Sequence, residues 1–265
     1  MAETAQLRAA CEAAAGRLVA AGARRWVAVA ADDSGPRRVP PPATGTFAGY
    51  GVDVPVALGS GSRIETALAA DRPSLLPLSV SVPLSVPLPL PLLIAGWLRE
   101  RVGAAEVTGE LLHPSVAGAE CAAHGRALAD GSIEPVGLLV LGDGASTHAA
   151  PGAGRVDERA GPFDAAVRDA LANADTGTLL SLDERLTAEL GVTGRPGWQV
   201  LAGVAERAGT PWRAELLYSA APYGVAYHVA VWQPLKAAPP YEALCGVGQH
   251  GETSHGEAQC HEAQR

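Results

Sequence analysis

Two polar segments follow apolar runs and carry the residue types that acid–base chemistry needs. The first is Asp32-Asp33-Ser34, which comes directly after the apolar run from Trp26 to Ala31. The second is Gly-Asp-Gly-Ala-Ser-Thr-His, residues 142–148, directly after the apolar run from Val136 to Leu141. A histidine can act as a general base near neutral pH, and glycine beside a strand end lets backbone approach a ligand closely.

These two segments meet if the apolar runs are neighbouring parallel strands, because ligands in open α/β sheets bind beyond the carboxyl ends of the strands. We therefore predict a small-molecule site in which His148 and Asp143 are catalytic. Its substrate-contacting residues would be Asp32, Ser146, Tyr223 and His228. The alternative is that Gly-Asp-Gly is an ordinary turn and His148 a solvated side chain. His113, His124 and His228 are also open to interpretation as structural or surface residues. Of the three, His228 is the one expected to face a pocket, because it follows the Pro-Tyr-Gly turn.

The elements that must position these residues alternate between helices and short apolar strands. Helices are expected at 4–21, 92–102, 118–128, 155–173, 181–190 and 198–207, the fifth opened by a Ser181/Glu184 capping box. Strands are expected at 26–31, 52–58, 105–112, 136–141, 215–218 and 225–232, and a loop at 36–51. This alternation predicts an α/β fold with helices on both faces of the sheet.

Composition excludes several classes of protein. The chain has 265 residues, a net charge of −8 and 48% hydrophobic residues, so it can bury a large core and is not disordered as a whole. Lys236 is the only lysine, and the acidic balance argues against nucleic-acid binding. Four widely spaced cysteines and the lack of a signal-peptide pattern favour a cytoplasmic protein.

One uncharged stretch, Pro73 to Leu98, is long enough for a membrane span but is interrupted by five prolines. We predict no membrane helix there. Instead we expect an apolar Pro-rich insertion at about 73–91, within a single domain spanning 1–236. The insertion is either a tolerated loop or a contact surface for a partner.

Residues 237–265 are predicted to be a disordered tail. Zinc-ligand residue types recur in it every five positions, at Cys245, His250, His255 and Cys260. Adventitious metal binding there is the alternative.

The segment 142–148, followed by Asp157-Glu158-Arg159 and Phe163-Asp164-Ala165-Ala166-Val167, resembles the class III extradiol ring-cleavage dioxygenases. This superfamily includes the protocatechuate dioxygenase β subunit and the Memo-type proteins. Further segments resemble an actinobacterial branch of it: 7–11, 43–45, 50–54, 77–79, 197–203 and 221–225. The resemblance implies a three-layer sandwich with a mostly parallel central sheet, and it covers roughly residues 7–232.

The family's chemistry uses Fe(II) held by two histidines and one carboxylate. The resemblance places these ligands on a strand that would precede residue 7, on the segment Ala31 to Ser34, and near Gly194 ahead of Trp198. None of these positions carries the family's ligand; only His148 matches a family residue, an acid–base histidine. We therefore expect a catalytically reduced relative that needs no cofactor and binds a small aromatic or carboxylate ligand.

Two alternatives stay open: an active Fe(II) ring-cleaving dioxygenase, and a non-enzymatic interaction protein that uses the apolar stretch. The resemblance also implies that the first strand of the family's sheet is missing. An uncovered sheet edge favours self-association, so we predict a homo-oligomer.

Overall fold

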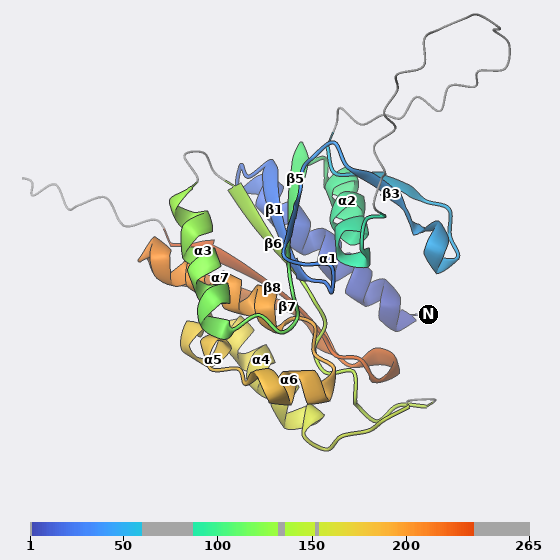
Figure 1. Cartoon of the computed structure of the whole chain (residues 1–265), viewed down its shortest axis with the longest axis vertical. Coiled ribbons are helices and arrows are strands. Elements are labelled where there is room, and N and C mark those ends of the chain that lie inside the picture. Colours follow the sequence, from blue (N-terminus) through green and yellow to red (C-terminus); the bar gives the residue numbers. More distant parts are fainter. Residues whose placement is uncertain (1, 60–86, 132–135, 152–153, 236–265) are drawn as a thin grey trace, which may run out of the picture. The chain divides into compact units, whose positions relative to one another are not determined.

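The computed structural model describes residues 2–59, 87–131, 136–151 and 154–235 (Figure 1). The predictions for most of the Pro-rich insertion and for the tail at 237–265 lie outside the described residues. None of the helices in the described ranges is long and apolar enough to cross a membrane.

The main sheet has four strands, in the order β2-β5-β1-β6. β1 (Arg25–Ala31) lies inside it and pairs in parallel with β5 (Glu106–Leu112) and with β6 (Val136–Leu141). β2 (Arg37–Val39) runs antiparallel along the outer edge of β5. The apolar runs that the sequence places at 26–31 and 136–141 are therefore neighbouring parallel strands, as predicted.

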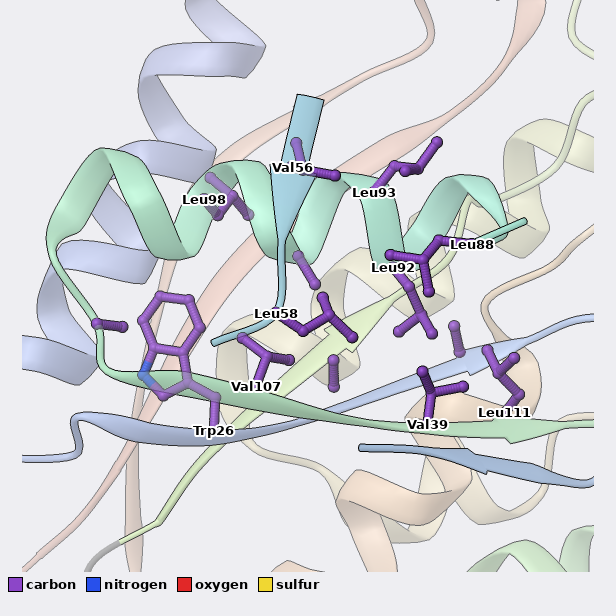
Figure 2. Packing of buried hydrophobic residues seen from close by; sticks show 14 of the residues in the cluster. Trp26, Val39, Val56, Leu58, Leu88, Leu92, Leu93, Leu98, Val107 and Leu111 are labelled. Carbon is purple, nitrogen blue, oxygen red and sulfur yellow. The ribbon is translucent and has the colours of Figure 1, made fainter. Parts of the chain in front are cut away.

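Helices cover both faces of this sheet. On one face, α1 (Ala2–Ala20) and α2 (Leu90–Val102) enclose a large apolar cluster that includes Trp26, Leu92 and Leu111 (Figure 2). On the other face, β-strand residues such as Val29 pack with Cys121 of α3 (Gly118–Asp130) and Val200 of α7 (Arg195–Ala208). Alternate residues of one strand point to opposite faces, so a continuous apolar run supplies both cores. The protein is a mixed α/β protein with a mostly parallel sheet flanked by helices.

The remaining elements form two hairpins and a helical group. β3 (Thr44–Thr46) and β4 (Pro55–Ala57) pair with each other and are separated by the short helix η1 (Phe47–Tyr50). The helical group comprises α4 (Ala160–Asn173), α5 (Thr176–Leu180) and α6 (Glu184–Leu190). The second hairpin joins β7 (Trp212–Ala220) to β8 (Tyr227–Pro234) through η2 (Pro222–Gly224), and it carries a bulge between Leu216 and Tyr218.

Several predicted boundaries were wrong. The expected loop at 36–51 contains β2 and β3, which are too short to show a period in the sequence. The expected strand at 52–58 is reduced to Pro55–Ala57. α4 begins at Ala160 rather than at residue 155, because the Asp157 carboxylate accepts a hydrogen bond from the Arg159 amide at 3.0 Å and fixes a turn there.

The predicted capping box was also wrong. Asp183 caps α6, accepting a hydrogen bond from the Leu186 amide at 2.7 Å. Ser181 instead ends the preceding helix, where its hydroxyl donates to the carbonyl of Thr178 at 2.9 Å. The short helix α5, which the sequence pattern did not predict, therefore takes the residue that we had assigned to the next helix.

Candidate acid–base site

The chain that leaves β6 runs beside the chain that enters β8. The Gly144 amide donates to the Ala226 carbonyl at 2.8 Å, the Ala226 amide donates to Ala145 at 2.9 Å, and the His148 amide donates to Gly224 at 3.1 Å. These three backbone bonds place His148, which follows β6, close to the residues that open β8. Two segments about 80 residues apart in the sequence thereby build one site.

The carboxylate of Asp164 lies at the centre of this site, in the second turn of α4. Its Oδ2 accepts a hydrogen bond from Nε2 of His148 at 2.6 Å, and its Oδ1 accepts one from Nε2 of His228 at 3.3 Å. The Ala145 amide also donates to both oxygens at 3.2 Å. Asp164 is only 5% exposed. Burying a carboxylate is costly unless donors replace its water, and these groups supply them.

The two imidazoles differ in their access to solvent. The side chain of His228 is 3% exposed, whereas that of His148 is 20% exposed. Because Nε2 of each ring donates to the carboxylate, Nδ1 of each neutral ring carries the lone pair. Nδ1 of His228 lies 2.9 Å from the hydroxyl of Ser219 on β7. In the described part of the chain, Nδ1 of His148 has no hydrogen-bond partner of this kind.

Asp143, the predicted catalytic partner of His148, takes a different role. Its amide donates to the Thr193 hydroxyl at 2.7 Å, and its carbonyl accepts from the Gly194 amide at 2.9 Å, so its backbone ties the end of β6 to the start of α7. Burial raises the pKa of its carboxyl group. Burial, followed by the charge of Asp143, raises the pKa of Tyr227. The Asp143 carboxylate therefore acts electrostatically on Tyr227. The carboxylate hydrogen-bonded to His148 is that of Asp164.

The other predicted substrate contacts lie apart from this network. Asp32 accepts hydrogen bonds from the amide of Ser34, at 2.9 Å, and from its hydroxyl, and so closes its own turn. Ser146 is exposed, with its hydroxyl 3.5 Å from the Leu190 carbonyl. Tyr223 is 65% exposed and has a φ of 58°. Of the six predicted site residues, the structure brings His148 and His228 together on one carboxylate.

Asp164 and Ser219 are site residues that the sequence did not reveal. Asp164 is 16 positions from His148 and 64 from His228, so no local spacing connects them. The one available signal was the Phe163-Asp164 pair, which carries part of the family resemblance. Ser219 has no comparable signal, because only the pairing of β7 with β8 places it opposite His228.

The placement of these residues does not fit an iron site. Two histidines and one aspartate match the ligand types of a non-haem Fe(II) centre, but here the carboxylate oxygens are hydrogen-bonded directly to the imidazole nitrogens. The described ranges contain no group of three or more His, Cys, Asp or Glu side chains able to hold a metal ion. At Gly194, where the resemblance puts the family's glutamate, an added Cβ would lie 2.4 Å from the ring of Trp198.

No protein-family model matches the chain, and a search of curated proteins finds no match either.

Proposed function

We propose that this protein binds a small aromatic or carboxylate compound at His148, and that His148 acts there as the acid–base group. The observation that carries the proposal is the 2.6 Å hydrogen bond from Nε2 of His148 to the buried Asp164 carboxylate. This bond fixes the ring and its tautomer, and it leaves Nδ1 without a hydrogen-bond partner among the described residues. In this reading the protein is a catalytically reduced relative of the class III extradiol dioxygenases, built on the same three-layer sandwich.

The chemistry follows from the Asp–His pair. A neutral His148 accepts a proton at Nδ1 from a phenol, or from solvent when the ligand arrives already ionised as a carboxylate. The imidazolium that results is stabilised by Asp164, which already accepts its Nε2–H, and the ligand anion remains beside the new Nδ1–H. Hydrogen bonds between charged groups are stronger than neutral ones, contributing roughly 1.5–3 kcal/mol. The pair therefore favours ligands that give up a proton near neutral pH.

Calorimetric titration of the full chain with 3,4-dihydroxybenzoate tests this proposal, since that compound carries both a catechol and a carboxylate. We expect saturable binding at one site per chain. His148→Gln should weaken it by about 10- to 100-fold, the loss that one charge-assisted hydrogen bond predicts.

The matched control is His113→Gln. His113 is exposed and, like His148, hydrogen-bonded, but its Nδ1 partner is the Ser115 hydroxyl at 2.7 Å rather than a carboxylate. This variant should bind as the unaltered chain does. Equal affinity of the His148 and His113 variants, or no binding by the unaltered chain of benzoate, catechol or 3,4-dihydroxybenzoate, contradicts the proposal.

A further inference from the structure

Ser219, His228 and Asp164 form a continuous hydrogen-bonded series at the β7–β8 hairpin. The Ser219 hydroxyl lies 2.9 Å from Nδ1 of His228, and Nε2 of His228 lies 3.3 Å from Oδ1 of Asp164. A hydroxyl, an imidazole and a buried carboxylate in this order are the parts of a nucleophilic acyl-transfer site. We propose that Ser219 is the nucleophile of an esterase activity toward small carboxylic esters, separate from ligand binding at His148.

The hairpin's bulge creates this alignment. Leu216 pairs with Ala230, and an unbroken antiparallel ladder from that point would place Tyr218 opposite His228. The register shift between Leu216 and Tyr218 moves Tyr218 opposite Val229 and brings Ser219 opposite His228. Bulges re-aim side chains in this way and are frequent beside active sites.

The three members of the series differ in their exposure to solvent, and each exposure suits the role of that residue. Ser219 is exposed and can meet a substrate from solution. The side chains of His228 and Asp164 are 3% and 6% exposed, so water does not compete for the bond between them. Because Asp164 accepts Nε2–H of His228, the lone pair of the ring lies on Nδ1 and faces the Ser219 hydroxyl.

The reaction balances with water as the only co-reactant. Oγ of Ser219 bonds to the acyl carbon as its proton passes to Nδ1 of His228. The bond from the acyl carbon to the alcohol oxygen then breaks, and His228 returns the proton to that oxygen. Water, deprotonated by His228, attacks the acyl-serine, releases the carboxylic acid and restores the Ser219 hydroxyl. Asp164 holds the imidazolium during both halves.

A second serine–histidine pair in the same protein provides the comparison. The Ser115 hydroxyl lies 2.7 Å from Nδ1 of His113, but that nitrogen also accepts the Ser115 amide at 3.2 Å. Both residues are exposed, and no carboxylate of the described ranges is hydrogen-bonded to Nε2 of His113. The Ser115–His113 pair therefore has the short hydroxyl–imidazole contact but no buried carboxylate hydrogen-bonded to the other ring nitrogen. We expect Ser115 to be unreactive.

The test treats the full chain with a fluorophosphonate probe, followed by peptide mapping, and measures hydrolysis of 4-nitrophenyl acetate. We expect the probe on Ser219, and at least tenfold slower hydrolysis in Ser219→Ala. Ser115→Ala should keep both the labelling and the rate. No aromatic ligand is present, so the result is independent of whether His148 binds one.

Cysteine substitutions make the test independent of probe fit. Ser219→Cys should react with iodoacetamide at pH 7 at least tenfold faster than Ser115→Cys. Both introduced thiols would lie beside an imidazole, but only His228 is hydrogen-bonded to a buried carboxylate, Asp164, which stabilises the imidazolium paired with the thiolate. Absence of probe on Ser219, labelling of Ser115 to the same extent, or equal alkylation of the two introduced cysteines would overturn the proposal.

Discussion

Asp164 links the two histidines chemically as well as geometrically. Each of its oxygens serves a different ring, and both accept from the Ala145 amide. Charge that develops on either imidazole is therefore felt by the other through one shared carboxylate. A ligand bound at His148, as proposed, would therefore change the strength of the hydrogen bond between Asp164 and His228.

The raised pKa of Asp143 leads to a prediction about the pH dependence of stability. Burial raises the pKa of its carboxyl group in the folded protein, so the folded state binds its proton more tightly than the unfolded chain. The stability from this protonation is present at low pH and is lost as pH rises through the raised pKa. Asp143→Asn should therefore raise the melting temperature at pH 7 and lose that advantage near pH 3. A lower melting temperature for Asp143→Asn at pH 7 would contradict this.

At the residue scale, the sequence singled out both histidines that the structure places on one carboxylate, but it did not single out that carboxylate, Asp164. His148 and His228 stood out because each adjoins a turn at a strand end. Asp143 was proposed because it lies five positions from His148, and spacing is the only measure of proximity that a sequence offers. In the structure the backbone pairing of Gly144 with Ala226 brings His148 and His228 to Asp164 instead, and no local sequence pattern marks long-range pairing of this kind.

Close contact between α3 and α7 holds one face of the sheet in place. An added Cβ at Gly125 would lie 2.1 Å from the Val200 carbonyl oxygen, and one at Gly203 would lie 2.2 Å from that of Ala122. The two backbones approach too closely for any side chain at these glycines. Since α7 also begins where Asp143 is anchored, this packing contributes to the position of the loop that follows β6.

Gly203→Ala should destabilise the protein by about 1–3 kcal/mol, the usual range for an overpacked core. The matched control is Gly161→Ala on α4, where an added Cβ meets nothing within 4 Å. That change should instead stabilise the helix by roughly 0.5–1 kcal/mol. Urea denaturation of both variants measures the difference in the free energy of unfolding. Equal midpoints for the two variants would show that α3 and α7 accommodate the added methyl group at Gly203 without loss of stability.

Elements with strong patterns were predicted well and short ones were not. The apolar run that became β1 is bounded by Arg25 and Asp32, and the one that became β6 by Pro135 and Gly142. The expected ends of both match the structure to within one residue. β2 was missed because its three residues, Arg-Arg-Val, depend on pairing with β5 rather than on a pattern of their own. Its position was also obscured by a Pro- and Gly-rich context, which is typical of loops.

At the scale of the whole molecule, the two long edges of the main sheet differ. The outer edge of β5 is covered by β2 and by Leu58, whose carbonyl accepts from the Val107 amide at 2.6 Å. β6 pairs only with β1 within the described residues. β1 has a partner on each side. The liability that favours self-association therefore lies at β6.

We predict that two or more copies associate through β6. Light scattering at micromolar concentration should give at least twice the chain mass of 27.0 kDa. Val136→Lys, at the 39%-exposed start of β6, should shift the mass toward the monomer. Val156→Lys, 54% exposed and outside any strand, is the matched control and should not. A monomeric unaltered chain would refute this arrangement.

The most direct test of the central claim is an NMR titration of the full chain with 3,4-dihydroxybenzoate that follows the ring signals of its seven histidines. If His148, held by Asp164, receives the ligand's proton, its ring signals should move saturably toward those of an imidazolium. Those of His228 should follow through the shared carboxylate, while those of His113 and His124 stay in place. Unchanged His148 signals at saturating ligand, or equal shifts in His113 and His148, would contradict acid–base binding at His148.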